Sequence, residues 1–274
     1  MPIKENILFF IITFILSYYI TPKTLDMLRT GEVMEKNIRG EIIPVAAGII
    51  FSAVLAPVFL LQSLFFDYSR DAFMYLGFIT LISLAGFVDD IAGTGGNKGF
   101  SGHFSYLRHH KKWTTGIWKS LLGIITAAIA AVAPSVSWFD LIINTLIIAL
   151  MANFFNLLDV CPGRSIKIFF LGALLILVFL PSNTGNILLF PLLGAVSAYA
   201  FYDFQGKSMM GDTGSNVLGF ALGLPLIAAG NISLRVVILV LLLLLHGISE
   251  RISFSQIIRN NKVLFQLDRL GRRD

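Results

Sequence analysis

The sequence has little charge for its length. Only 14% of its 274 residues are Asp, Glu, Lys or Arg, whereas 56% are hydrophobic. A soluble domain normally carries about a quarter charged residues, so this chain cannot cover a water-facing surface of its size. It also lacks a long polar segment that could form a separate soluble domain. The shortage of charge excludes an ordinary soluble protein and predicts that much of the surface faces lipid.

Cysteine is almost absent, because Cys161 stands alone. A single cysteine excludes an intramolecular disulfide framework and a cysteine-rich zinc site. The apolar run from Ile7 to Ile20 has no small-residue cleavage site after it, so we expect a retained first helix and not a signal peptide. The net charge of +5 is better explained by basic loops on the inner side of a membrane than by a nucleic-acid partner.

The apolar runs predict an all-α, polytopic membrane helix bundle. A helix needs about 20 mostly apolar residues to cross the hydrocarbon core. About nine transmembrane helices are expected, at roughly residues 3–20, 44–66, 72–88, 117–133, 138–157, 168–181, 186–203, 215–232 and 234–250. Residues 1–274 are interpreted as a single integral membrane domain, in which residues 254–274 form a basic cytoplasmic tail.

The basic residues set the expected orientation. Alternating spans divide the loops into two sets, and one of them carries only Lys4, Arg70 and Arg235. The other set holds nearly all remaining Lys and Arg residues, in residues 21–43, 89–116, 158–167, 204–214 and the tail. The positive-inside rule makes this second set cytoplasmic. The N-terminus is therefore expected outside and the C-terminus inside, with any chemistry in the long inner loops.

The first candidate motif is the pair Asp89-Asp90, at the end of the apolar run 72–88. Two adjacent carboxylates repel one another and are costly to desolvate. A divalent cation such as Mg²⁺, which prefers oxygen ligands, would relieve both costs. An ordinary solvated helix end is the alternative interpretation.

The second candidate motif runs from Asn153 through Asn156 to Asp159. Its spacing of three residues places the polar side chains along one helical face, which is expected to border the bundle interior or a cavity. Hydrogen bonds between helices are the alternative, which explains the Asn residues well and Asp159 poorly. Arg164 follows a Pro-Gly turn and offers a guanidinium suited to phosphate.

The third motif, Gly211-Asp212-Thr213-Gly214-Ser215-Asn216, opens a predicted span. Backbone N–H groups at such a helix start can bind an anion, and Asp212 could ligate a metal or simply cap the helix. The loop 93–113 carries a Lys and His run that suits anionic lipid or a diphosphate. Lys119, about two turns inside the next span, requires an anionic partner. Together these motifs match the layout of metal-assisted phosphoryl transfer.

In these residues the chain resembles the polyprenyl-phosphate N-acetylhexosamine-1-phosphate transferase family. That family includes phospho-N-acetylmuramoyl-pentapeptide translocase and undecaprenyl-phosphate GlcNAc-1-phosphate transferase. The similar segments cover most of the chain, in order: Asn37-x-Arg39-Gly40, Phe87-Val-Asp89-Asp90, Lys98 to Lys119, Asn153 to Asp159, and Met210 to Ser215.

The resemblance implies transfer of an N-acetylhexosamine-1-phosphate from a UDP-sugar to polyprenyl (undecaprenyl) phosphate, with release of UMP, as the membrane-initiating step of a cell-envelope glycan. It implies Mg²⁺, or alternatively Mn²⁺, bound by Asp212 and Asp90. The implied catalytic residues are Asp89, Asp90, Asp159 and Lys119. The implied substrate-binding residues are Asn153, Asn156, Arg164, Lys167, Lys36, Arg39 and Gly211.

The same resemblance implies a multi-pass protein of the bacterial plasma membrane, surrounded by membrane lipids, with its active site on the cytoplasmic face. It also suggests a homodimer, and it leaves open whether the lipid phosphate attacks directly or through an aspartyl intermediate. Direct attack suits the chemistry, because a phosphate oxyanion is already a nucleophile.

The sequence departs from the family's pattern at two places, and these departures leave the identity of the transferred sugar unpredicted. Pro162 stands where relatives carry another Asp, and a His-rich loop before the last helix is missing. A transporter of an anionic solute is one alternative, although the acidic residues lie at span ends and no internal repeat is seen. An inactive homologue that serves as a scaffold is the other, although Asp89, Asp90, Asp159 and Asp212 are all present.

Overall fold

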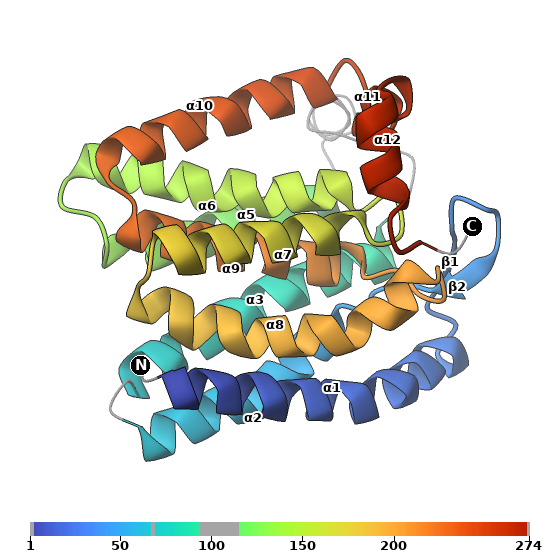
Figure 1. Ribbon diagram of the computed structural model, residues 1–274, viewed down its shortest axis with the longest axis horizontal. Coiled ribbons are helices and arrows are strands. Elements are labelled where there is room, and N and C mark those ends of the chain that lie inside the picture. Colours follow the sequence, from blue (N-terminus) through green and yellow to red (C-terminus); the bar gives the residue numbers. More distant parts are fainter. Residues whose placement is uncertain (1–2, 67–68, 94–114, 273–274) are drawn as a thin grey trace.

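The structure, a computed structural model, describes residues 3–66, 69–93 and 115–272. It is a bundle of antiparallel helices with one small hairpin (Figure 1). The long helices are α1 (Ile3–Thr30), α2 (Ile49–Phe65), α3 (Ser69–Ala92), α5 (Thr115–Val132), α6 (Trp138–Leu158), α7 (Arg164–Phe179), α8 (Asn183–Phe204), α9 (Gly211–Ala229) and α10 (Ile232–Ser249). Two short helices follow, α11 (Phe254–Asn260) and α12 (Lys262–Arg269). Strands β1 (Met34–Lys36) and β2 (Ile42–Pro44) pair antiparallel.

The predicted all-α membrane fold is confirmed. Each predicted span coincides with one of the long helices, although the boundaries differ by several residues. Six of these helices are long and apolar enough to cross a membrane: α1, α3, α5, α6, α8 and α10. The two chain ends lie at opposite ends of the bundle, as an odd number of crossings requires (Figure 1). The number of crossings and the orientation remain predictions.

Helix α9 is the central helix, and its small residues explain why. Its side chains are buried all the way from Thr213 to Ile227, and it packs against α3, α6, α7 and α8. At Gly219, an added Cβ would lie 2.3 Å from the Met151 carbonyl oxygen of α6, so only glycine permits this approach. The close packing places the polar start of α9 among the ends of its neighbours.

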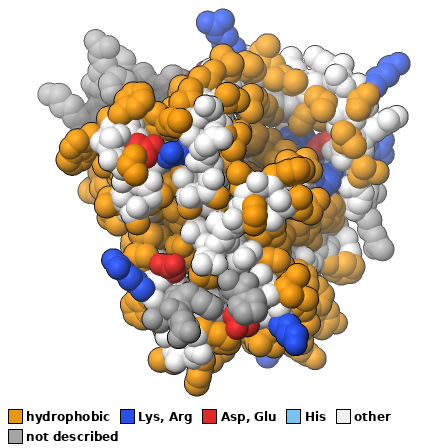
Figure 2. All heavy atoms as spheres, turned by 60° about the vertical axis from the view of Figure 1, so that its left-hand side comes forward, with side chains coloured by type: hydrophobic (Ala, Val, Ile, Leu, Met, Phe, Trp, Pro, Cys, Tyr) orange, Lys and Arg blue, Asp and Glu red, His pale blue; other side chains and the backbone are white. Residues whose placement is uncertain are grey.

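The outer surface is mostly hydrophobic. Figure 2 shows apolar side chains over most of one face, with few charged groups between them. Helix α10 is an extreme case, because Leu242 is its one buried residue. Exposed apolar side chains of this kind need lipid around them, since a soluble protein rarely exposes so large an apolar area.

Arg235, at the start of α10, pairs with α6 at the bundle end opposite the hairpin. Its guanidinium lies 2.6 Å from the Asp140 carboxylate and donates to the Asn144 amide oxygen at 2.9 Å. This buried pair fixes α10 to α6 and accounts for one of the few cations in the predicted outer set of loops.

The hairpin and the C-terminal helices lie at the other end of the bundle, called the site end below (Figure 1). Backbone hydrogen bonds join the hairpin to the segment before α9: Met209 N–H donates to Pro44 at 2.8 Å, and Ala47 N–H donates to Met209 at 3.1 Å. The ends of α3, α6 and α8 and the starts of α7 and α9 meet there.

Candidate active site

Three charged side chains from three helices meet at the site end. Asp89 lies in the last turn of α3, Lys119 lies on α5 and Asp212 lies in the first turn of α9. The Lys119 ammonium is 2.9 Å from the Asp89 carboxylate and forms a second ion pair with Asp212. All three side chains are between 16% and 19% exposed. These two carboxylates are the anionic partners expected for Lys119, and the three residues form the Lys119 cluster.

Asp90 caps the start of α9. Its two oxygens accept hydrogen bonds from the backbone N–H groups of Asp212 at 2.9 Å and Thr213 at 3.0 Å, and from the Thr213 hydroxyl at 2.5 Å. The first backbone N–H groups of a helix lack partners within the helix, so a carboxylate from another helix satisfies them here. Asp90 thereby joins the end of α3 to the start of α9. It is therefore not part of an ordinary solvated helix end, which was the alternative interpretation of the Asp89-Asp90 pair.

The glycines in this region allow the close approach. Gly211 has a φ of +70°, and a Cβ there would lie 2.4 Å from an oxygen of Asp90. At Gly86 on α3, a Cβ would lie 2.4 Å from the Asp212 carbonyl oxygen. Gly211 is therefore required for the backbone conformation and for contact with Asp90, whatever its relation to substrate.

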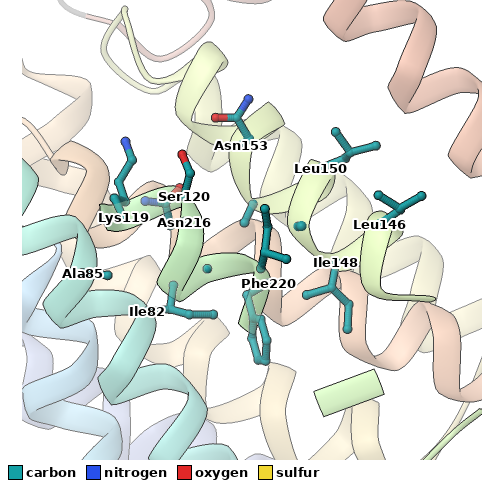
Figure 3. A pocket seen from close by; sticks show the side chains of 14 residues that line it. Ile82, Ala85, Lys119, Ser120, Leu146, Ile148, Leu150, Asn153, Asn216 and Phe220 are labelled. Carbon is teal, nitrogen blue, oxygen red and sulfur yellow. The ribbon is translucent and has the colours of Figure 1, made fainter. Parts of the chain in front are cut away.

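An apolar cavity of about 240 Å³ opens beside the cluster, between α3, α5, α6 and α9. Its polar end carries Lys119, Asn153 and Asn216, and its deeper wall includes Ile148 and Phe220 (Figure 3). Such a cavity suits an apolar chain with an anionic head group next to the ammonium. The predicted residues Lys119 and Asn153 are brought together, and Asn216 from the third motif joins them.

A second, smaller pocket contains the carboxylates of Asp159 and Asp203. The Asp159 carboxylate accepts a hydrogen bond from the Ser165 hydroxyl at 3.1 Å, and Asp203 accepts one from the Gly163 N–H at 2.6 Å. Loss of hydration raises the pKa of Asp159 well above its usual range, and the nearby Asp203 charge raises it further. Asn156 lies one turn before Asp159, and its backbone carbonyl accepts a hydrogen bond from the Asp159 backbone N–H at 3.2 Å.

Sequence reasoning missed Asp203. The residue is buried at the end of α8, where the predicted span 186–203 also ends. A carboxylate at the inner end of an apolar span was the signal that singled out Asp89, and the same signal applies to Asp203.

Arg164 and Lys167 are both engaged by the C-terminal helices. The buried Arg164 guanidinium donates to the Asp268 carboxylate at 2.8 and 3.0 Å and to the Ser255 hydroxyl at 3.0 Å. The Lys167 ammonium donates to backbone carbonyls at the end of α12, among them Leu267 at 3.0 Å. Both cations thus have protein partners, and their part in substrate binding remains a prediction.

The contacts with Arg164 also change the pKa of Asp268. Burial alone would raise the pKa of Asp268, but the hydrogen bonds and charge of Arg164, followed by those of Arg272, hold this pKa below its usual range. Asp268 is therefore an ionised member of a buried ion pair on α12.

Lys36 and Arg39 lie on the hairpin. Lys36 ends β1 and is exposed, and the backbone N–H of Arg39 donates to the Asn37 side chain at 2.9 Å. The hairpin adjoins the smaller pocket through Asn37 and Ile38, which line it. The predicted basic loop, with Lys98 and the Lys and His run, lies in residues 94–114, outside the described residues.

The carboxylates of the Lys119 cluster are the candidate ligands for a magnesium ion. Among the described residues, no group of three or more His, Cys, Asp or Glu side chains is placed to hold a metal ion. Asp89 and Asp212 nevertheless contact one ammonium, so they are close enough to share a cation. Mg²⁺ is usually bound by one or two carboxylates together with substrate phosphates. The donor set therefore fits a Mg²⁺ ion whose coordination the substrate completes.

Comparison with known proteins gave one family match. Residues 72–230, more than half of the chain, match glycosyl transferase family 4. The matched segment runs from α3 to the end of α9, so it contains the Lys119 cluster, Asp90 and Asp159, and it leaves out the hairpin and the C-terminal helices. A search of the curated proteins found no match.

Proposed function

The chain belongs to glycosyl transferase family 4, and from this membership we propose that it transfers an N-acetylhexosamine-1-phosphate from a UDP-sugar to polyprenyl phosphate, with release of UMP. The family supports a membrane transferase that uses a lipid phosphate and a nucleotide sugar. The observation that carries the finer proposal is the Lys119 cluster at the mouth of an apolar cavity. We place the site on the cytoplasmic face of a bacterial plasma membrane, where undecaprenyl phosphate is the acceptor.

In this proposal the cavity holds the first isoprene units of the acceptor, and its phosphate lies against Lys119. The ammonium neutralises the phosphate and orients one of its oxygens. That oxygen bonds to the phosphorus that carries the sugar. The bond from this phosphorus to the bridging oxygen breaks, and UMP leaves with the electron pair. No proton has to be removed from the nucleophile, because a phosphate monoester is ionised near neutral pH.

Mg²⁺ would be held by Asp212 and Asp89 together with substrate phosphates, and would neutralise charge that builds on the leaving group. This choice revises the expectation for Asp90, because both of its oxygens already accept hydrogen bonds from the start of α9. Asp90 is instead proposed to position Asp212. Mn²⁺, also an oxygen-binding cation, is expected to substitute.

The smaller pocket is proposed to receive part of the donor. Asp159 and Asp203 lie there with Asn37 and Ser208, and such a set of acceptors and donors suits the hydroxyl and amide groups of a nucleotide sugar. A buried hydrogen-bond acceptor that loses its partner costs free energy. We therefore expect this pocket to discriminate between different nucleotide sugars. The identity of the sugar and a homodimer remain predictions.

The test is UMP release by the purified protein in detergent, supplied with undecaprenyl phosphate, Mg²⁺ and a panel of UDP-N-acetylhexosamines. UMP is expected with at least one donor, is expected to disappear with EDTA, and should return when Mg²⁺ or Mn²⁺ is added in excess. A folded preparation that binds the lipid phosphate yet releases no UMP with any donor would contradict the proposal.

A further inference from the structure

The chain folds back at the membrane surface after α10. Four residues, 250–253, separate the end of α10 from the start of α11. Helix α10 is long and apolar enough to cross a membrane. An extended chain covers at most roughly 3.3–3.6 Å per residue, so α11 must begin close to the surface at which α10 emerges. Figure 1 shows α12 running across the direction of the long helices, as a helix lying in the plane of that surface would.

Helix α12 has three different faces. Asp268 lies on the face that docks on the bundle, where it pairs with Arg164. A second face is apolar and faces outward; it consists of Val263 (64% exposed), Leu264 (41%) and Leu267 (52%), and Leu270 (60%), directly after the helix, continues it. At about 100° per residue, these four side chains form one continuous arc. The third face is polar and includes Lys262, Gln266 and Arg269.

The exposed charge of residues 250–270 is mostly positive, although Glu250 is exposed as well. Arg251, Arg259, Lys262 and Arg269 are all exposed. Asp268 does not offset them at the surface, because it is buried against Arg164 and Arg272. Basic side chains beside an amphipathic helix are attracted to anionic lipid head groups.

We propose that α12 is an interfacial anchor that lies on an anionic membrane surface, with the Val263–Leu264–Leu267–Leu270 arc in the boundary between head groups and acyl chains. An amphipathic helix with a basic polar face binds membranes in this way. A second copy of the chain is a poorer occupant, since four side chains on a short helix cannot bury the roughly 1,000 Å² of a stable interface. The proposal does not depend on the reaction proposed above.

The anchor has a consequence for the site end. Asp268 is on the same helix and holds Arg164, the first residue of α7, and Arg272 donates to the Pro162 carbonyl at 3.2 Å. These contacts fix the turn between Asp159 and α7. A helix held at the membrane surface therefore sets the height of this turn relative to the lipid head groups.

The test places a nitroxide spin label at one cysteine, either Leu267→Cys on the apolar arc or Gln266→Cys on the polar face, in a Cys161→Ser background. Each protein is reconstituted at one copy per nanodisc, with or without phosphatidylglycerol in phosphatidylcholine, and collisions with oxygen and with a water-soluble nickel chelate are measured. With phosphatidylglycerol, we expect the label at 267 to collide with oxygen several times more often relative to nickel than the label at 266.

Adding Arg259→Gln and Lys262→Gln, or omitting phosphatidylglycerol, is expected to reduce that ratio at position 267. Nickel that reaches both labels equally in anionic discs would overturn the proposal, because α12 would then be in water. Shielding of position 267 from both reagents would also overturn it, because protein would then cover the arc. A ratio that is equal in neutral and anionic discs would overturn the role of anionic lipid.

Discussion

Asp90 on α3 accepts two hydrogen bonds from Thr213 on α9, one from its backbone N–H at 3.0 Å and one from its hydroxyl at 2.5 Å. Its neighbour Asp89 instead pairs with Lys119. Two adjacent and chemically identical residues therefore serve different purposes: one aligns the start of α9, and the other belongs to the charged cluster. The alignment fixes where Asp212 lies.

Asp90→Ala is expected to lower the free energy of unfolding by about 1–3 kcal/mol, because backbone N–H groups of α9 lose their acceptor, and to abolish UMP release. Asp90→Asn keeps one acceptor oxygen and is expected to lose less stability. Thermal unfolding in detergent and turnover are measured together. Asp26→Ala, at an exposed carboxylate on α1, is the control. An unchanged melting temperature in Asp90→Ala would refute the capping role.

Lys119→Gln is expected to reduce turnover about 10²–10³-fold, the usual cost of removing one group that stabilises developing charge. The Mg²⁺ concentration for half-maximal activity should not rise, because Asp89 and Asp212 both remain. Asp212→Asn, by contrast, should raise it, since a metal ligand loses its charge. The measurement is a Mg²⁺ titration of each variant, with Lys23→Gln on the exposed face of α1 as control. A higher Mg²⁺ requirement in Lys119→Gln would contradict this division of roles.

Gly123→Leu is expected to fill the apolar cavity and raise the apparent KM for the polyprenyl phosphate. Gly123 lines the cavity, and an added Cβ there meets nothing within 4 Å, so the helix should tolerate the larger side chain. Gly77→Leu on α3 is the matched control, because Gly77 also has open space around it but does not line the cavity. Equal lipid kinetics for the two variants would place the acceptor elsewhere.

Arg164→Met is expected to lower the free energy of unfolding by less than the roughly 3–5 kcal/mol of a buried pair broken outright, because Asp268 keeps Arg272 as a cationic partner. Combining it with Asp268→Leu should recover only part of that loss, since the mostly buried Arg272 side chain then loses its carboxylate partner. Chemical denaturation of the single and double variants checks this. Arg29→Met is the control, because its pair with Asp26 is exposed and worth at most about 1 kcal/mol.

Acid is expected to weaken the docking of α12. The pKa of Asp268 is lower in the folded protein than in an unfolded chain, so the unfolded state binds protons more readily. The stability from its ionised form is present above the unfolded pKa, near 4, and is lost as the pH falls through the folded pKa. The gap in melting temperature between the native protein and Asp268→Asn should therefore shrink below about pH 4. A gap of constant size from pH 7 to pH 3 would argue against the linkage.

Much of the fold was predictable because its signals are local. Each long helix follows from an apolar run of roughly membrane length, and α10, with its nearly continuous aliphatic sequence, buries only Leu242. The need of Lys119 for an anionic partner also followed from its position within an apolar span. The partners themselves did not follow, since Asp212 is 93 residues further along the chain.

The C-terminal segment shows where sequence reasoning stopped. Its basic composition predicted a tail, whereas the structure forms α11 and α12 and docks them on α7. Arg164 and Asp268 are 104 residues apart, and nothing near either residue indicates the other. Asp203 could have been found, because it ends an apolar span as Asp89 does, but its hydrogen bond with Gly163, 40 residues away, could not be predicted.

The sequence by itself determined that the chain is a helical membrane protein and predicted which residues carry the chemistry, because hydropathy and the ordered motifs are properties of neighbouring residues. Only the tertiary structure decided how those residues divide the work. Asp89 and Asp212 share one ammonium, Asp90 caps a helix, and Arg164 is held by the C-terminal helix. Close packing of α3 and α9 at Gly86 and Gly211 brings Asp90 next to the start of α9. Each of these contacts joins residues that are far apart in the sequence, so local patterns do not reveal them.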